Sequence, residues 1–112
     1  MLKYNQIMGV HEEIRSKILR RQYEFSKHAV DQTLLRDIAV RELEEAMASR
    51  SEIIEDYPDD KYGPSCLILG FTQAGRPLHV QCSYPSRPLI KIITVYQPDP
   101  DQWTDLRVRR QD

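Results

Sequence analysis

The chain has 112 residues, of which 40% are hydrophobic and 29% are charged, and its 16 basic and 17 acidic residues give a formal net charge of −1. A chain of this length has room for one domain with a single hydrophobic core. The charge balance excludes a general attraction to nucleic acid or to membranes, so any site for an anion must be local.

The first predicted element is an amphipathic helix over residues 5–21. Charged residues fill one side of it, and the other side carries apolar residues at spacings of three and four: Ile7, Val10, Ile14 and Ile18. A short strand is predicted next, over Tyr23–Phe25. Ser26 then provides an N-cap for a second helix that begins at Lys27. A third helix is predicted from about Val40 to Ser49.

After the third helix, the apolar period changes to that of β-strands. The pattern predicts four of them: Glu52–Tyr57, Ser65–Thr72, Leu78–Tyr84 and Leu89–Tyr96. The short loops between them allow only antiparallel neighbours, because a parallel return needs a longer crossover. We therefore expect an α+β fold with helices packed on one face of a four-stranded antiparallel sheet. The tail, residues 99–112, is predicted to be irregular, with Trp103 anchoring it to the core.

The cysteines and the apolar runs indicate the cellular compartment in which the protein is expected. Cys66 and Cys82 both lie in strand patterns, and the first residues do not resemble a secretory signal, so we expect reduced thiols and a cytoplasmic location. No apolar run approaches the roughly 20 residues that span a membrane. The spacing of histidines and cysteines matches no metal-binding motif, and the sequence predicts neither a metal nor a cofactor.

His79 is the first candidate for chemistry. It lies in an apolar strand, where a histidine is either a hydrogen-bonded core group or a group that transfers protons, and both interpretations stay open. Alternation places His79 on the face opposite the core. The hairpin register decides whether its neighbours include Tyr96 or Lys91, and a slip of one residue reverses the answer.

His28 is the second candidate, in the first turn of the helix that begins at Lys27. A helix N-terminus offers backbone donors to an anion, and Arg36 lies two turns further along, so a phosphate could be held here. The alternative is that His28 only packs or caps locally.

Four segments in this order resemble a known family: Ser26–Ala29, Ile53–Pro58, Gly75–Val80 and Ile92–Pro98. It is a small prokaryotic family of unknown function, common in cyanobacteria, whose members are often encoded beside a short zinc-finger-type protein resembling an antitoxin. The resemblance covers about residues 20–104, with residues 22–98 as the family core of a single domain over residues 1–112. The family is in turn similar to RelE-, BrnT- and MqsR-like toxins of type II toxin–antitoxin pairs.

This resemblance implies a RelE-like architecture and metal-independent cleavage of messenger RNA, with RNA and a cognate antitoxin as partners. In such enzymes the 2′-hydroxyl attacks the neighbouring phosphate, which requires a base, an acid and cations. Either histidine would be the base, and Tyr96 or the other histidine the acid. By motif, the implied catalytic residues are His28, Arg36, His79 and Tyr96, and the implied substrate-binding residues are Lys27, Arg76 and Lys91.

One departure from the family pattern favours a different class of function. The second helix often carries an arginine where Gln32 stands here, which removes one cation from the expected phosphate site. The alternative hypothesis is a non-catalytic protein-binding module, a degenerate toxin whose histidines are structural.

Overall fold

The computed structural model describes residues 4–111, with side chains from residue 9 onward. In chain order, the elements are α1 (Tyr4–Leu19), β1 (Tyr23–Phe25), α2 (Lys27–Arg36), α3 (Val40–Ala48), β2 (Glu52–Tyr57), β3 (Ser65–Phe71), β4 (Pro77–Ser83), β5 (Ile90–Tyr96), β6 (Trp103–Thr104) and β7 (Val108–Arg109). Each predicted helix and strand is therefore present. The α+β class is confirmed.

The sheet differs from the prediction in one strand. Its order is β1-β5-β4-β3-β2, and β2 to β5 form the expected antiparallel meander. β1 adds a fifth strand that runs parallel to β5, with Tyr23 opposite Ile90 and Phe25 opposite Ile92. The prediction of a four-stranded antiparallel sheet was wrong, because loop lengths constrain only strands that follow each other in the chain.

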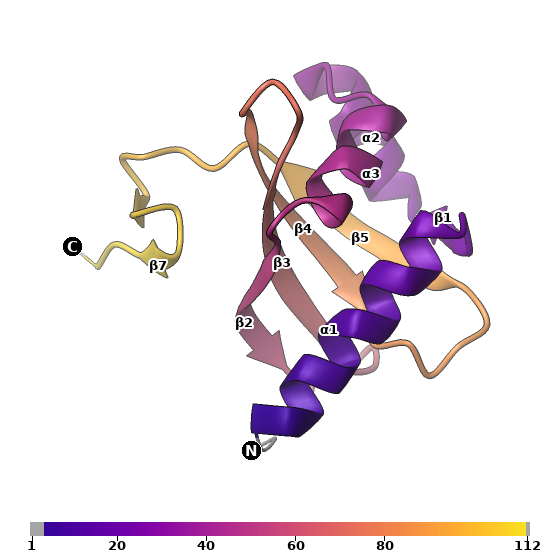
Figure 1. The fold of residues 1–112 in the computed structure, drawn as a ribbon. Coiled ribbons are helices and arrows are strands. Elements are labelled where there is room, and N and C mark those ends of the chain that lie inside the picture. Colours follow the sequence, from indigo (N-terminus) through magenta and orange to yellow (C-terminus); the bar gives the residue numbers. More distant parts are fainter. Residues whose placement is uncertain (1–3, 112) are drawn as a thin grey trace.

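The core lies between the sheet and the helices α1 and α3, and α1 crosses the strands in Figure 1. Ile14 and Ile18 of α1 are fully buried, whereas Ile7 lies outside the described side chains. α3 approaches β3 closely at Gly70, where an added Cβ would lie 2.3 Å from the carbonyl oxygen of Ala46. Only glycine fits this contact between a helix and a strand.

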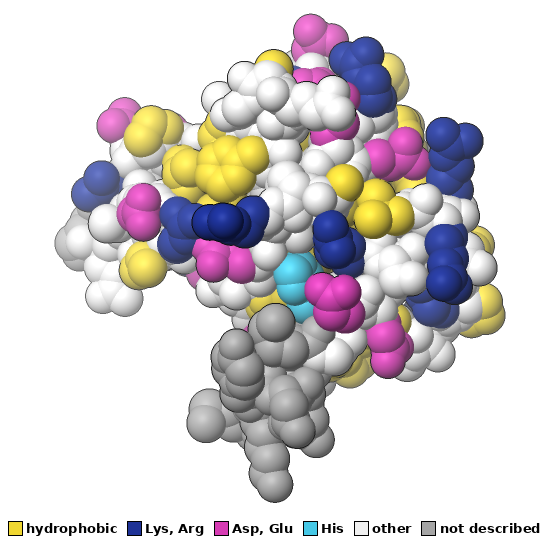
Figure 2. Space-filling view, in the orientation of Figure 1, with side chains coloured by type: hydrophobic (Ala, Val, Ile, Leu, Met, Phe, Trp, Pro, Cys, Tyr) yellow, Lys and Arg dark blue, Asp and Glu magenta, His cyan; other side chains and the backbone are white. Residues whose placement is uncertain are grey.

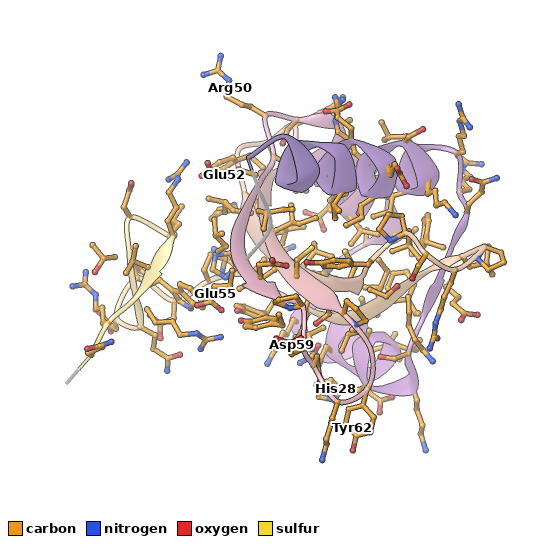
Figure 3. All side chains as sticks on the ribbon, turned by 90° about the horizontal axis from the view of Figure 1, so that it is seen from below. His28, Arg50, Glu52, Glu55, Asp59 and Tyr62 are labelled. Carbon is orange, nitrogen blue, oxygen red and sulfur yellow. The ribbon has the colours of Figure 1, made fainter. Side chains whose placement is uncertain are left out.

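α2 runs along the edge of β5 beyond the end of β1. The Ser26 hydroxyl caps the helix by accepting a hydrogen bond from the Ala29 amide, as predicted. One helical turn apart, Gln32 accepts from the Val95 amide at 3.1 Å and Arg36 donates to the Val95 carbonyl at 3.2 Å. These two side chains therefore form the hydrogen bonds to the Val95 backbone that a neighbouring strand would otherwise form. In Figure 3 the strands pass between α1 and α2, so the helices are not all on one face.

A β-bulge decides which residues of β5 face His79. Cys82 pairs with Ile92 but Gln81 pairs with Thr94, so Ile93 is an extra residue in β5. An extra residue reverses the alternation of faces beyond it. His79 consequently lies opposite Tyr96, which settles the register that the sequence left open.

The tail is folded, so the prediction of an irregular segment was wrong. β6 and β7 pair as a short antiparallel hairpin, which lies to one side of the main sheet in Figure 1. The predicted anchor is confirmed, because Trp103 is only 4% exposed. Asp105 and Leu106 adopt left-handed backbone conformations, with φ of 53° and 63°, at the turn of this hairpin. No helix within residues 4–111 has the length and apolar character to cross a membrane.

Candidate functional site

The sheet face turned away from α1 and α3 carries a polar hollow, which we call the Tyr96 pocket. Its volume is about 340 Å³. It is built where α2, β4, β5 and the C-terminal hairpin meet, and its lining includes Gln32, Arg36, Gln81, Tyr96, Trp103 and Arg109. Two basic groups and three aromatic rings, with Tyr57 as the third, therefore share a small concave surface.

His79 lies behind Tyr96 and Trp103 of this pocket and is fully buried. Its Nε2 lies 2.6 Å from the carbonyl oxygen of Leu106, which can only accept, so Nε2 carries the proton. Nδ1 of the neutral ring then accepts from the Tyr96 hydroxyl at 3.1 Å. The ring of Trp103 stands edge-on to the imidazole, with centroids 4.4 Å apart. Burial lowers the pKa of His79, so the imidazole is neutral at pH 7.

Tyr96 links the buried imidazole to the open pocket. Burial raises the pKa of its phenol above the ordinary value, so the group is protonated near neutral pH. The guanidinium carbon of Arg36 lies 5.7 Å from the centre of the Tyr96 ring, within the range of a cation–π contact. Within residues 4–111, Arg36 forms no ion pair with a carboxylate, so its charge is available to an anion in the pocket.

Arg109 and Trp103 complete the pocket, and sequence reasoning did not find them as site residues. The guanidinium of Arg109 lies 4.6 Å from the centre of the Trp103 ring and donates to the Glu55 carboxylate at 3.0 Å. This hydrogen bonding to Glu55 raises the pKa of Arg109. Figure 3 shows Glu55 on the side of the sheet that faces the hairpin. No local motif signals this pairing, because it joins segments far apart in the chain.

Three of the four predicted catalytic residues come together, and the fourth does not. Arg36 and Tyr96 line the Tyr96 pocket, and His79 contacts Tyr96 from below. His28 and Lys27 are exposed at the start of α2 and do not line it. A helix rises about 1.5 Å per residue, so His28 lies about 12 Å along the axis from Arg36.

Arg76, a predicted substrate-binding residue, is engaged by the protein itself. Its guanidinium donates to Glu42 at 3.1 Å and to the carbonyl oxygens of Arg36 and Asp37 at 3.1 and 3.0 Å. It also donates to Gln97 at 2.9 Å. These contacts tie the end of α2 to α3 and to the end of β5, and its contact with substrate stays a prediction.

Gln32 and Lys91 also have clear positions. Gln32, which replaces an expected cation, holds the edge of β5 through Val95 and so has a structural use. Lys91, another predicted substrate-binding residue, lies five residues from Tyr96 along β5, or about 16 Å at the usual rise. It lines a different hollow.

The face that carries α1 offers no comparable basic site. Figure 2 shows basic and acidic side chains interspersed across the described part of it. Within residues 4–111, no three His, Cys, Asp or Glu side chains cluster as metal ligands would. The Tyr96 pocket is therefore the strongest candidate site on geometric grounds.

Comparison with known proteins gives one match. The model of a family described as "Domain of unknown function (DUF4258)" matches residues 25–97, whereas no curated protein and no solved structure matches the chain. The matched segment contains α2 and β2 to β5, and with them Arg36, His79 and Tyr96. α1 and the C-terminal hairpin lie outside it. Because the match covers well over half of the chain, this protein belongs to the DUF4258 family.

Proposed function

We propose that the protein is a metal-independent endoribonuclease that binds the scissile phosphate of RNA in the Tyr96 pocket. One observation carries the proposal: Arg36 and Tyr96 line a single hollow and His79 is hydrogen-bonded to Tyr96 behind it, and a resemblance to RelE-like toxins implies all three as catalytic. An enzyme gains most when its groups are held together before substrate binds.

In this mechanism, Tyr96 and His79 act together as the base. The 2′-hydroxyl gives its proton to the Tyr96 oxygen while Tyr96 passes its own proton to Nδ1 of His79. The imidazolium that forms is held by its Nε2–H bond to the Leu106 carbonyl. The 2′-oxygen bonds to phosphorus, the bond to the 5′-oxygen breaks, and that oxygen takes a proton from water. The hydroxide that remains takes the proton of the imidazolium back through Tyr96, which restores the neutral Tyr96–His79 pair. Since burial raises the pKa of Tyr96 and lowers that of His79, transfer between them alone is uphill, and the two proton movements must be coupled.

Arg36 is the group placed to stabilise the phosphorane. Its charge is free of carboxylate partners within the described residues, and its guanidinium is positioned by the hydrogen bond that it donates to the Val95 carbonyl. A fixed cation beside developing negative charge is typically the largest single contribution to such catalysis. Arg109 supplies a second, partly neutralised cation, because Glu55 binds it.

A second function is favoured by the burial of His79. The imidazole is fully enclosed and both of its nitrogens have partners inside the protein, as in a purely structural histidine. Under this alternative the protein is a non-catalytic module, and the same pocket binds a protein partner. For either function, the resemblance makes a zinc-finger-type antitoxin the expected partner and the cytoplasm the expected location.

The experiment is cleavage of RNA in the presence of a chelator, with and without ribosomes, and with analysis of the ends. The wild type is expected to produce 2′,3′-cyclic phosphate and 5′-hydroxyl ends. Tyr96→Phe keeps the ring and removes the hydroxyl, so it should lower the rate about 10²- to 10⁴-fold. Arg36→Gln should lower it about 10²- to 10³-fold. Arg50→Gln, an exposed site away from the pocket, should leave it unchanged.

Two outcomes would reject the nuclease. Wild-type protein that cleaves no RNA under either condition would favour the binding module. Cleavage that is equal in the wild type and in Tyr96→Phe would show that the Tyr96 pocket is not the site.

A further inference from the structure

A second hollow lies beside the sheet, between the β2–β3 loop and the β4–β5 connection, and we call it the Lys91 pocket. Its volume is about 410 Å³, within the range of roughly 300–1,000 Å³ that is usual for small-ligand sites. The residues that define it for this argument are Asp60, Tyr62, Ser83, Arg87 and Lys91. Neither the Tyr96–His79 pair nor Arg36 belongs to it.

The charges in this pocket favour an anion. Within residues 4–111, neither Lys91 nor Arg87 forms an ion pair, whereas the arginines of the C-terminal hairpin and Arg76 do. The carboxylate of Asp60 is occupied by its own loop: its oxygens accept from the Ser65 hydroxyl at 3.2 Å and from the Tyr62 amide at 3.4 Å. Two cations are thus left without a carboxylate partner in one concave surface.

The backbone segments that carry Arg87 and Lys91 are fixed by hydrogen bonds to other parts of the protein. The ammonium of Lys17 on α1 donates to the carbonyl oxygens of Arg87 and Pro88 at 2.7 and 3.2 Å, which fixes the β4–β5 connection. The amide of Lys91 donates to the Ser83 hydroxyl at 2.9 Å, which fixes the start of the strand that carries the lysine. A site ordered in advance loses less entropy when a ligand binds.

An exposed aromatic ring stands at the rim. Tyr62 is 81% exposed, although a ring of this size gains free energy by leaving water. Figure 3 shows Tyr62 projecting from the side of the molecule away from α1. The ammonium of Lys61 lies 4.9 Å from the centre of the Tyr62 ring, so one face of the ring carries a cation and the other is open. An aromatic face beside cations is the usual arrangement for binding single-stranded nucleic acid, because bases stack on the ring while the cations hold the backbone.

The Lys91 pocket is joined to the Tyr96 pocket by a third hollow of about 470 Å³. This hollow shares Asp60 with the former and Tyr57 and Gln81 with the latter, and the carboxylates of Asp59 and Asp60 both line it. A continuous depression therefore crosses the open face of the sheet. A single strand that reaches from the Tyr96 pocket to Lys91, about 16 Å along β5, would pass beside these two carboxylates, so its phosphates bind at the two ends of the depression and not in the hollow between them.

We propose that the Lys91 pocket is a second RNA subsite, in which Lys91 and Arg87 bind a backbone phosphate of single-stranded RNA and Tyr62 stacks against a base. The scissile phosphate lies elsewhere, in the Tyr96 pocket. The choice of RNA as the polyanion rests on the proposed function. The location of the subsite rests on the free cations, the exposed ring and the continuous depression.

The test is the affinity of the full chain for a short 2′-O-methylated single-stranded RNA, which cannot be cleaved by 2′-hydroxyl attack. Lys91→Gln should weaken binding about tenfold, as expected for loss of a charged hydrogen bond. It should also reduce the slope of log affinity against log salt by about 0.7, the value for one contact with single-stranded phosphate. Arg50→Gln removes the same charge on the side opposite Tyr62 in Figure 3, and should change neither quantity. Tyr62→Ala should weaken binding, while Tyr62→Phe keeps the stacking face and should bind as the wild type does.

The outcomes separate this proposal from the one on function. The subsite would be overturned if Lys91→Gln bound the RNA as tightly as the wild type, or if it lost no more affinity than Arg50→Gln. It would also be overturned if the wild-type protein did not bind the probe. If the wild type binds through Lys91 but never cleaves unmodified RNA, the subsite stands and the nuclease fails. If the wild type cleaves RNA and Lys91→Gln binds and cleaves equally well, the nuclease stands and the subsite fails.

Discussion

Replacement of Trp103 by alanine should release the C-terminal hairpin without unfolding the domain. Trp103 is 4% exposed and packs edge-on against His79, yet it is not part of the hydrophobic cluster that holds the helices against the sheet. The rest of the hairpin is held by the Leu106–His79 hydrogen bond and by the ion pairs Arg107–Glu52 and Arg109–Glu55. The indole is therefore the main apolar contact between hairpin and sheet.

The magnitude follows from these contacts. Truncation of a buried tryptophan costs about 3–5 kcal/mol. The hydrogen bond contributes about 1 kcal/mol and each partly exposed ion pair about 0.2–1 kcal/mol, so Trp103 contributes the largest share. Amides of residues 103–109 should exchange with solvent about a hundredfold faster or more, since each 1.4 kcal/mol is a factor of ten. The pKa of His79 should rise toward its ordinary value, because the burial that lowers it is removed.

The assay is NMR, which reports the titration of the His79 ring and the exchange of the hairpin amides in one sample. Val108→Ala, at a position that is 62% exposed on the same hairpin, is the matched control and should alter neither. A Trp103→Ala protein in which His79 titrates as in the wild type would refute the argument. So would cooperative unfolding of α1, α3 and the sheet together with the hairpin.

Three further predictions concern stability. Gly70→Ala should lower the free energy of unfolding by about 3 kcal/mol, the upper end of the usual cost of an overpacked core. The new Cβ would lie 2.3 Å from the backbone oxygen of Ala46, which can move only if α3 moves, and urea denaturation measures the effect. Gln32→Ala should cost about 1–3 kcal/mol in the same assay, since it leaves the buried amide of Val95 without an acceptor. The free energy of unfolding should fall as the pH falls from about 6.5 to the lowered pKa of His79, because the unfolded chain binds a proton in this range and the folded ring does not. The slope should be at most about 1.4 kcal/mol per pH unit, and thermal melts across this range measure it.

Controls exist for each of these. An added Cβ at Gly9 meets nothing within 4 Å, so Gly9→Ala in α1 should be neutral or stabilise by up to about 1 kcal/mol. Gln22→Ala, at an exposed site, should stay within about 0.5 kcal/mol of the wild type. His79→Gln should flatten the pH profile without abolishing it, because burial also lowers the pKa of His11. Equal stability of the Gly70 and Gly9 variants, a neutral Gln32→Ala, or an unchanged pH slope in His79→Gln would each contradict the corresponding reasoning.

The elements of this fold could be predicted because their signals are local. Ser26 marks the start of α2 by a side chain that binds an amide three residues away, and the strands are marked by alternation within a few residues. The parallel pairing of β1 with β5 could not be predicted, because residues 23–25 and 90–92 share no local signal. The hairpin at the C-terminus was missed for a related reason: its turn uses Leu106 at positive φ beside Asp105, where sequence rules expect glycine, asparagine or aspartate.

The candidate site depends on the same non-local features. His79 and Tyr96 were both identified as candidates, but their contact requires the extra residue Ile93, which periodicity does not reveal. Arg109 was not identified because it reaches the pocket only through the folded tail. His28 was grouped with the others by motif and its spacing of two turns from Arg36 was evident, but only the fold shows that the pocket forms at the Arg36 end of α2.

The hydrogen bonds from α2 to the edge of β5 have a consequence for self-association. An unprotected sheet border can template a foreign strand, which is how many proteins begin to polymerise into fibrils. Here β1 pairs with the first part of β5, and Gln32 and Arg36 bind the Val95 backbone further along, so an incoming strand finds the edge of β5 already in use and meets only the three-residue strand β1. The opposite border is β2, where Glu52 and Glu55 bind Arg107 and Arg109 of the C-terminal hairpin, which lies to that side of the sheet in Figure 1. Crowded molecules of this protein should therefore resist fibril growth, and loss of the glutamine would open one route to it.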